Sequence, residues 1–266
     1  MGALRTDDVE FFVHVDRRTP RPLFEAMRAA VDKVADVTFV ARHASAWGTF
    51  GHIRASVEGI GAALASPAGI DYGLLLTGQD YPLRSNADIA AFLRDAQGRS
   101  YMEYEQLPRA GAWWAGERGG RDRVERWHFH LGDRHVSLPG LRHLPLNLAA
   151  YGGSAHWTLS RACLEHVERF VAAHPAVMRF FRFTRSPDEL FFQTILLNSP
   201  LADTIVCDDL RYTKWRPPSP HPEVLEPADL DALRAARGRA LFARKFDADG
   251  APEVLDLLDS EVRLAR

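Results

Sequence analysis

Glu189 is the residue whose type and sequence context most directly suggest chemistry. It ends the segment Ser186-Pro187-Asp188-Glu189, which has the pattern of a helix start: a Ser N-cap, Pro in the first turn and a Glu that reaches back to the N–H of the cap. A carboxylate in a first helical turn is also held rigidly, is kept ionised by the helix dipole and can act as a general base in a crevice. The residues alone leave the capping role and the base role open.

Two aspartates follow predicted buried strands. Asp16 comes directly after the apolar run 9–15, and Asp80 follows the run 71–76 by a short segment. In open α/β sheets, ligands bind beyond the carboxyl ends of the strands, so both are candidate binding residues. The alternative is that each is a turn residue whose carboxylate accepts local backbone N–H bonds.

Aromatic and basic side chains add further candidates. Trp157, Trp215 and the pair Trp113-Trp114 offer surfaces that stack on the apolar faces of sugars, although most tryptophans fill cores. Lys245 follows Arg244 and is one of three lysines in the chain. It is either a ligand for a diphosphate or a solvated surface charge.

A histidine-rich segment suggests a metal site as an alternative. His128 and His130 would share one face of a strand, with Asp133 and His135 close behind. Two such ligands could begin a zinc site, but the spacing fixes no third ligand. A metal-dependent hydrolase is therefore a minor hypothesis.

The elements that must position these residues have the pattern of an α/β protein, in which short apolar runs alternate with amphipathic segments. No internal repeat or second core is evident, so we predict one domain over residues 1–266. The segment from Arg109 to Asn147 lacks periodicity, which predicts a long functional or mobile loop. We expect strands at 9–15, 37–40, 71–76 and 101–105, and a return of regular structure at 151–160. We expect helices at 22–34, 47–64, after a cap at Asn86, after a cap at Ser160, and at 227–237.

The composition excludes several classes of protein. With 33 basic and 35 acidic residues and a net charge of -2, the chain lacks the basic surplus typical of nucleic-acid binders. Two cysteines are too few for a disulfide framework. No segment has the length and apolarity of a signal peptide or of a membrane span, which predicts a cytoplasmic protein.

Five segments occur in the order seen in a known family. Together they resemble the core-2/I-branching glycosyltransferases, which include β-1,6-N-acetylglucosaminyltransferases and peptide O-xylosyltransferases. The secreted animal members carry a membrane anchor and disulfides, so the resemblance is to a bacterial-type member. The segments are Trp47-Gly48, Leu76-Thr77-Gly78-Gln79-Asp80-Tyr81-Pro82-Leu83, Gly153-Ser154-Ala155-His156-Trp157-Thr158-Leu159-Ser160-Arg161, Ser186-Pro187-Asp188-Glu189 and Leu241-Phe242-Ala243-Arg244-Lys245-Phe246-Asp247.

The resemblance implies a GT-A type α/β fold with a mostly parallel central sheet flanked by helices. Residues 9–105 would form the nucleotide-binding half, and residues 106–266 the acceptor and catalytic half. The implied reaction is an inverting transfer of N-acetylglucosamine or xylose from a UDP-sugar to an acceptor hydroxyl. No cofactor or divalent metal is implied, because basic side chains bind the diphosphate instead.

The resemblance also implies roles for particular residues. Glu189 matches the catalytic base, Asp16 in His14-Val15-Asp16 matches an aspartate near the uracil, and Lys245 matches the lysine on the leaving diphosphate. The residues implied at the acceptor are Glu103, Trp215, Asp80 and Trp157. The acceptor is a glycan, a peptide or a lipid-linked hydroxyl, and the last of these would place the enzyme peripherally at the inner membrane face.

Two departures from the family pattern are visible. The family arginine at the diphosphate is absent from Ser219-Pro220-His221-Pro222-Glu223, which leaves His221, Lys214, Arg216 or Arg244 to replace it. The family also has a strand and a helix before the His14-Val15-Asp16 strand, whereas this sequence offers only Met1 to Asp8. We therefore expect a missing first strand-helix unit, an exposed strand edge and poor solubility. A non-catalytic sugar-nucleotide or glycan binding protein is the alternative function.

Overall fold

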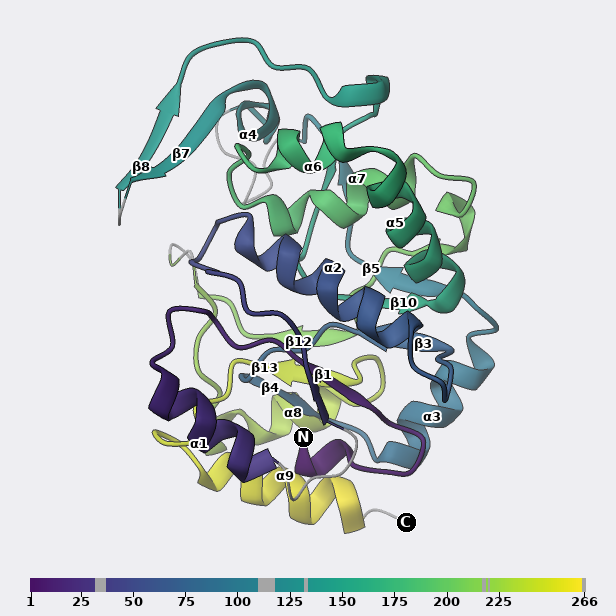
Figure 1. Ribbon diagram of the computed structural model, residues 1–266. Helices are drawn as coiled ribbons and strands as arrows, with labels where there is room; N and C mark the ends of the chain where they lie inside the picture. The colour runs from purple at the N-terminus through teal and green to yellow at the C-terminus, as the bar shows by residue number, and fades with distance from the viewer. Residues whose placement is uncertain (32–36, 110–117, 132–133, 217–218, 220, 265–266) are drawn as a thin grey trace.

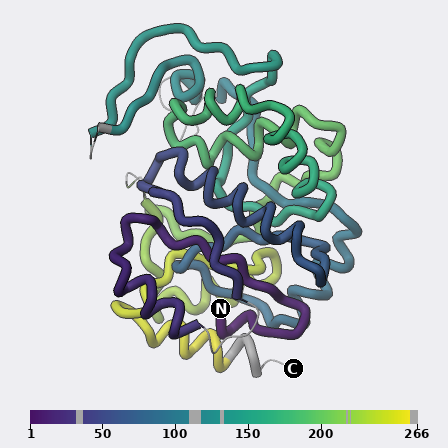
Figure 2. Tube along the Cα trace, viewed as in Figure 1, coloured from purple at the N-terminus to yellow at the C-terminus, as the bar shows by residue number. Residues whose placement is uncertain are grey.

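The computed structural model describes the chain except for residues 32–36, 110–117, 132–133, 217–218, 220 and 265–266. Helix α2 crosses the middle of the molecule, between a lower part that holds both termini and an upper part (Figures 1 and 2). The helices are η1 (Gly2–Leu4), α1 (Arg21–Val31), α2 (Gly51–Leu64), α3 (Asn86–Asp95), α4 (Arg121–Glu125), η2 (Pro145–Asn147), α5 (Arg161–Ala173), α6 (Pro175–Phe181), η3 (Pro187–Glu189), α7 (Phe191–Leu197), η4 (Ala202–Thr204), η5 (Pro227–Asp229), α8 (Leu230–Ala236) and α9 (Glu253–Leu264). The strands are β1 (Phe11–Val13), β2 (Val37–Phe39), β3 (Tyr72–Leu74), β4 (Asp80–Pro82), β5 (Ser100–Met102), β6 (Glu105–Gln106), β7 (Trp127–Leu131), β8 (Arg134–Leu138), β9 (Tyr151–Gly152), β10 (Trp157–Ser160), β11 (Ile205–Val206), β12 (Arg211–Thr213) and β13 (Phe242–Arg244).

The four-stranded sheet has the strand order β11-β5-β10-β3. β11 runs parallel to β5, but β10 is antiparallel to both β5 and β3. Three of the four strands, β11, β5 and β3, thus run in the same direction and β10 runs against them, so the expected mostly parallel central sheet is not confirmed. The chain leaves β5 and returns at the same end of the sheet, where Trp157 lies opposite Met102. β6, which follows β5, pairs antiparallel with β9, which precedes β10. The chain therefore enters β10 in the direction opposite to that of β5.

Helices α2, α5 and α7 pack together beside this sheet and form the largest core cluster. Ile53, Met102, Leu164 and Phe192 are all at most 1% exposed in this cluster, and they come from α2, β5, α5 and α7. Residues of both predicted halves, 9–105 and 106–266, thus share one core. Burying such side chains stabilises a fold by about 1.5–3 kcal/mol each.

A second sheet, β12-β13-β4, brings the last of the five family segments next to the second one. β13 is parallel to β12 and antiparallel to β4, and the register places Arg244 opposite Asp80. Helices α8 and α9 pack beside this sheet through a separate cluster that includes Leu83, Leu233 and Val254. This packing fixes the position of the Arg244-Lys245 segment relative to the end of β4.

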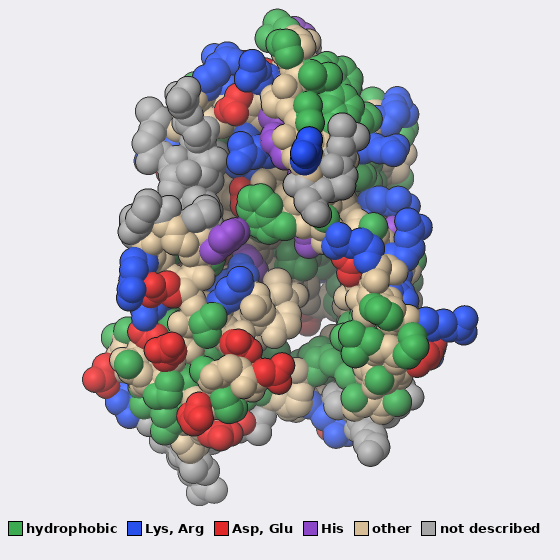
Figure 3. Space-filling view, turned by 90° about the vertical axis from the view of Figure 1, so that its left-hand side faces the viewer, with side chains coloured by type: hydrophobic (Ala, Val, Ile, Leu, Met, Phe, Trp, Pro, Cys, Tyr) green, Lys and Arg blue, Asp and Glu red, His purple; other side chains and the backbone are tan. Residues whose placement is uncertain are grey.

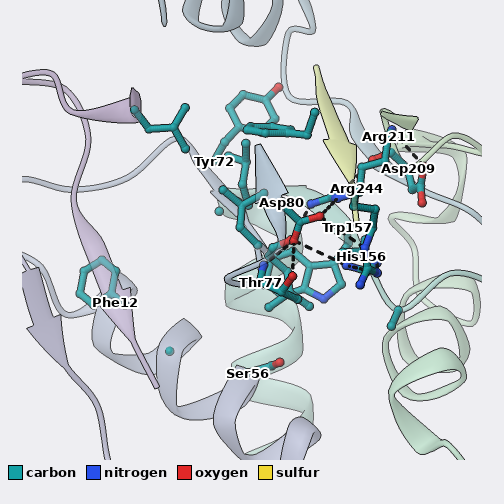
Figure 4. A pocket seen from close by; sticks show the side chains of 18 of the residues that line it. Phe12, Ser56, Tyr72, Thr77, Asp80, His156, Trp157, Asp209, Arg211 and Arg244 are labelled. Atoms are coloured by element: carbon teal, nitrogen blue, oxygen red, sulfur yellow. Dashed lines mark hydrogen bonds and ion pairs between the residues drawn. The ribbon is translucent and has the colours of Figure 1, made fainter. Parts of the chain in front are cut away.

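β1 and β2 form a separate parallel pair, and β3 is an edge strand of the four-stranded sheet. One edge of β1 and one edge of β3 thus have no strand partner in the part of the chain that the structure describes. A large cavity lies between them, with Phe12 on one side and Tyr72 on the other (Figure 4). The open strand edge and the poor solubility expected from the sequence remain predictions.

Three local expectations need correction. The cap of α3 is Ser85, whose Oγ accepts from the N–H of Asp88 at 3.1 Å, rather than Asn86. Ser160 does not cap α5 through its side chain, which lies 3.1 Å from Ser100 Oγ instead. The segment from Arg109 to Asn147 is not one irregular loop, because α4 and the β7–β8 hairpin form within it.

No helix of the described residues is long and apolar enough to cross a bilayer.

Candidate active site

A cavity of about 2860 Å³ holds the candidate site. This volume exceeds the ~300–1,000 Å³ of an ordinary ligand site, so there is room for two substrates. Figure 3 shows the molecule hollowed below its middle, and Figure 4 shows a part of the lining around Asp80 and Arg244. All seven predicted site residues line this cavity: Asp16, Asp80, Glu103, Trp157, Glu189, Trp215 and Lys245.

The segment that carries Glu189 is not the predicted capping motif. Ser186 has a left-handed backbone with φ 43°, its side chain caps nothing, and its N–H donates to the carbonyl of Gly48 at 3.1 Å. Glu189 therefore cannot reach back to a free N–H at Ser186. Its carboxylate instead accepts from Arg123 Nη2 at 2.8 Å. The helix-cap interpretation is wrong, and the carboxylate stays 22% exposed at the cavity.

Arg123 is a site residue that the sequence analysis missed. It lies on α4, is 4% exposed, and donates to the carbonyls of Arg185 at 3.1 Å and Ser186 at 2.6 Å as well as to Glu189. One guanidinium thus fixes both the turn before Glu189 and the carboxylate itself. No signal in the sequence distinguishes Arg123 from the other arginines of its segment.

The protonation of Glu189 is governed by opposing effects. Burial raises the pKa of Glu189, Arg123 lowers it, and the neighbouring carboxyl of Asp188 raises it again. The net shift is upward, which makes Glu189 a stronger proton acceptor than an ordinary surface glutamate. Burial also raises the pKa of Asp188.

Asp80 and Trp157 are the two expected acceptor residues whose side chains are buried. The side chain of Asp80 is fully buried, and its Oδ2 accepts from the N–H and the hydroxyl of Thr77 at 2.5 and 2.7 Å. Trp157 is 4% exposed and packs against Phe192 at 5.4 Å between ring centroids. Asp80 and Trp157 thus line the cavity but leave little side-chain surface to an acceptor, and their expected acceptor role remains a prediction.

Asp80 also belongs to a buried charge cluster (Figure 4). Its Oδ1 lies 3.6 Å from Arg244 Nε and 3.9 Å from Arg211 Nε. Arg244 Nη1 lies 2.8 Å from His156 Nε2. Burial, with Arg211 and Arg244 nearby, holds the pKa of His156 well below its usual range, so the neutral imidazole can accept from Arg244. The cluster orients Arg244 beside Lys245.

Of the four residues that could replace the family arginine, Arg244 and His221 line the cavity. Lys214 Nζ is instead paired with Asp229 at 2.7 Å, and Arg216 with Glu223 at 2.8 Å. Arg244 is itself paired with Asp80, so the difference between the candidates is that Lys214 and Arg216 do not line the cavity.

Asp16 lies at the end of β1 on the cavity wall. Its carboxylate accepts from Arg18 Nη2 at 2.7 Å and from the N–H of Ser45 at 3.2 Å. The side-chain hydrogen bond from Arg18 holds the pKa of Asp16 well below its usual range. Arg42 donates to the carbonyl of Asp16 at 2.7 Å and so ties this turn to the end of β2.

Glu103 and Trp215 keep surface available at the cavity. Glu103 directly follows β5 and is exposed, and Trp215 is 41% exposed just after β12. Partial burial of the carboxyl and the nearby Asp209 raise the pKa of Glu103. Of the four expected acceptor residues, these two therefore have the exposure that the role requires.

The histidine segment forms hydrogen bonds to protein groups instead of a ligand set. His128 Nδ1 lies 3.0 Å from His135 Nε2, and His128 Nε2 lies 2.9 Å from the carbonyl of Asp122. Within the described ranges, no three His, Cys, Asp or Glu side chains are grouped to hold a metal ion. Asp133, which completes the sequence pattern, and the pair Trp113-Trp114 lie outside the described residues.

The five family segments meet at one cavity, and a comparison with protein families agrees with the resemblance that they indicated. The family model described as Core-2/I-Branching enzyme matches residues 3–234. The chain belongs to this family. The core-2/I-branching resemblance drawn from the five segments is thereby confirmed.

Curated relatives include proteins named as xylosyltransferases. Xylosyltransferase 2 of Rattus norvegicus is 28% identical over 267 residues, which cover 94% of this chain. Xylosyltransferase 2 of Homo sapiens is likewise 28% identical over 267 residues. Xylosyltransferase 1 of Mus musculus is 29% identical over 205 residues, or 71% of this chain. The chain spans about 30% of the length of the Xylosyltransferase 2 proteins.

Proposed function

We propose that this protein is an inverting glycosyltransferase that moves a sugar from a UDP-sugar to an acceptor hydroxyl, with Glu189 as the general base. The observation that carries the proposal is the Glu189 carboxylate, which Arg123 holds at 2.8 Å on the wall of the large cavity. Family membership supports a glycosyltransferase. The xylosyltransferase relatives favour xylose over N-acetylglucosamine as the first donor sugar to test.

The reaction needs one ionised carboxylate and a stabilised leaving group. Glu189 takes the proton of the acceptor hydroxyl. At the same time the acceptor oxygen forms a bond to C1 of the sugar, and the bond from C1 to the diphosphate breaks on the opposite face. Lys245 and Arg244 offset the negative charge that develops on UDP, a task that a divalent metal performs in other enzymes. Asp80 and His156 position Arg244.

The remaining residues divide between the two substrates. Asp16 binds near the uracil, at the end of β1. Glu103 and Trp215 contact the acceptor, since both line the cavity and keep exposed surface. An exposed carboxylate accepts hydrogen bonds from sugar hydroxyls, and an exposed indole stacks on their C–H faces.

Replacing Lys245 by Ala tests the nucleotide site. We expect UDP to bind the wild type in the presence of EDTA and to bind Lys245→Ala at least tenfold more weakly, about 1.4 kcal/mol, as measured by titration calorimetry. Lys214→Ala is the matched control, because Lys214 is paired with Asp229, and its UDP affinity should stay within about twofold. Equal losses in the two variants, or none in Lys245→Ala, would contradict the assignment. UDP binding without transfer to any acceptor would favour the non-catalytic alternative.

The pH dependence of transfer tests the base. Because the net environment of Glu189 raises its pKa and only the ionised form accepts a proton, kcat/KM should fall on the acid side with a midpoint above the ordinary Glu value of about 4.3. The measurement is kcat/KM from pH 4 to 9, with circular dichroism at each pH to exclude unfolding. A midpoint at or below the ordinary value would show that Glu189 is not the titrating base.

A further inference from the structure

The β7–β8 hairpin carries an exposed surface that neither the core nor the cavity explains. It projects from the upper part of the molecule (Figure 1), and its strands pair from Trp127 opposite Leu138 to Leu131 opposite Arg134. Trp127 and Leu138 face the same side because they are direct cross-strand partners. They are 39% and 48% exposed, and Leu141, which follows the hairpin, is 72% exposed.

Three exposed arginines lie in the hairpin or beside it. Arg126 precedes Trp127, Arg134 begins β8, and the guanidinium of Arg182 lies 5.8 Å from the ring of Phe183, which itself packs against Trp127. All three are exposed, and none makes an ion pair with another described residue. We call Arg126, Trp127, Arg134, Leu138, Leu141 and Arg182 the hairpin patch.

The local charge differs from that of the whole chain. Residues 118–148 and 175–186 hold nine arginines against three acidic residues, whereas the chain overall has 33 basic and 35 acidic residues. Three of those arginines are already paired, Arg118 and Arg121 with Glu125 and Arg123 with Glu189. Figure 3 shows basic and hydrophobic side chains next to one another at this end of the molecule. A surface that combines excess positive charge with exposed apolar side chains is complementary to a binding partner that is negatively charged and partly apolar.

We propose that the hairpin patch docks this protein onto an anionic lipid bilayer. Basic side chains are attracted to anionic headgroups, and Trp is favoured at the boundary between headgroups and acyl chains. Leu138 and Leu141 enter the apolar layer, which a nucleic-acid backbone does not offer. The chemistry of the patch therefore favours a membrane over RNA or DNA as the partner.

The patch is continuous with the candidate active site. Helix α4, which carries Arg123, ends at Glu125, and β7 begins at Trp127. Docking at the hairpin would therefore hold Glu189, the partner of Arg123, at a fixed position relative to the bilayer. This favours a membrane-borne acceptor hydroxyl, a consequence that rests on the proposed transferase function. The docking itself does not depend on that function.

Vesicle sedimentation tests the docking without any sugar transfer. The full chain is mixed with vesicles of phosphatidylcholine alone or with about 30% phosphatidylglycerol. We expect binding to the anionic vesicles, weakened by salt, and at least a tenfold lower partition coefficient for Arg126→Gln/Arg134→Gln/Arg182→Gln. The matched control, Arg21→Gln/Arg54→Gln/Arg169→Gln, removes the same charge from exposed arginines elsewhere and should stay within twofold.

A second variant tests the apolar contribution. Leu138→Ser/Leu141→Ser keeps every charge and should lower the residual binding at high salt, with an unchanged melting temperature as the check on folding. Absence of binding by the folded wild type, equal losses in the two arginine triples, or tighter binding to a single-stranded oligonucleotide than to anionic vesicles would each overturn the proposal. Failure of transfer with intact vesicle binding would count against the proposed function alone.

Discussion

Glu189→Gln is expected to lower the rate of sugar transfer by about 10²–10⁴-fold, the usual contribution of a general base. The amide cannot take the proton of the acceptor hydroxyl at any pH, so the acid limb of the pH profile should disappear with the activity. UDP affinity should stay within about twofold, because Lys245 and Arg244 are intact. Single-turnover transfer and UDP calorimetry on the same sample separate the two effects.

The stability of this variant should fall by less than that of Arg123→Met, because the amide oxygen of Gln still accepts from Arg123 at the same place, although the buried guanidinium loses its charged partner. A matched control is Glu125→Gln on α4, whose carboxylate pairs with Arg118 at 2.8 Å and Arg121 at 3.0 Å. It makes the same chemical change a short distance away and should leave kcat near the wild-type value. Comparable kcat in Glu189→Gln and the wild type would remove Glu189 from the mechanism.

Arg123→Met is expected to destabilise the fold by about 3 kcal/mol near neutral pH, since breaking a buried ion pair leaves an uncompensated charge. The variant also loses the hydrogen bonds to the carbonyls of Arg185 and Ser186 that hold the turn before Glu189. Without the guanidinium, which lowers the pKa of Glu189, that pKa rises further. Chemical denaturation at several pH values measures the loss.

The sign of the pH dependence follows from this shift. A carboxyl whose pKa is raised in the folded state binds its proton more tightly there than in the unfolded chain, so stability falls as pH rises through the folded pKa. The deficit of Arg123→Met should therefore be largest above the folded pKa of Glu189 and should shrink below the unfolded value of about 4.3. The acid limb of kcat/KM in this variant should move to higher pH than in the wild type.

Three companion variants distinguish positioning of Glu189 from general loss of structure. Arg121 lies on the same helix and its side chain is 53% exposed, so Arg121→Met should lower the free energy of unfolding by less than about 1 kcal/mol. Arg123→Lys should restore part of the stability and shift the acid limb back. In the Glu189→Gln background, Arg123→Met should lower the free energy of unfolding by less than it does in the wild type. Additive losses in that double variant would mean that the two side chains are not coupled.

Much of the local structure and the family could be predicted from the sequence. The helical periodicity of residues 22–34 and 47–64 and the apolar run 71–76 correspond to α1, α2 and β3. These patterns depend on neighbours within about four positions, so they can be recognised before the chain is folded. The five family segments are also local patterns, and their order was enough to name the family that the comparison confirmed.

The direction of β10 and the details of the site could not be read in this way. From the sequence, Glu189 could be either a helix-capping residue or a general base. In the fold the N–H of Ser186 donates to the carbonyl of Gly48, which excludes the capping role. The partner of Glu189 is Arg123, 66 positions earlier, in a segment without any periodic pattern. Asp80 and Trp157, which belong to family segments, proved to be buried.

The sequence by itself thus determined many of the elements, the family and the chemical types available to the cavity. Only the tertiary structure decided which carboxylates are open to a substrate, which cations are already paired, and which arginine holds Glu189. The physical reason is that secondary structure is favoured by interactions between near neighbours, whereas burial and ion pairing depend on segments far apart in the chain that meet only after the whole core has packed.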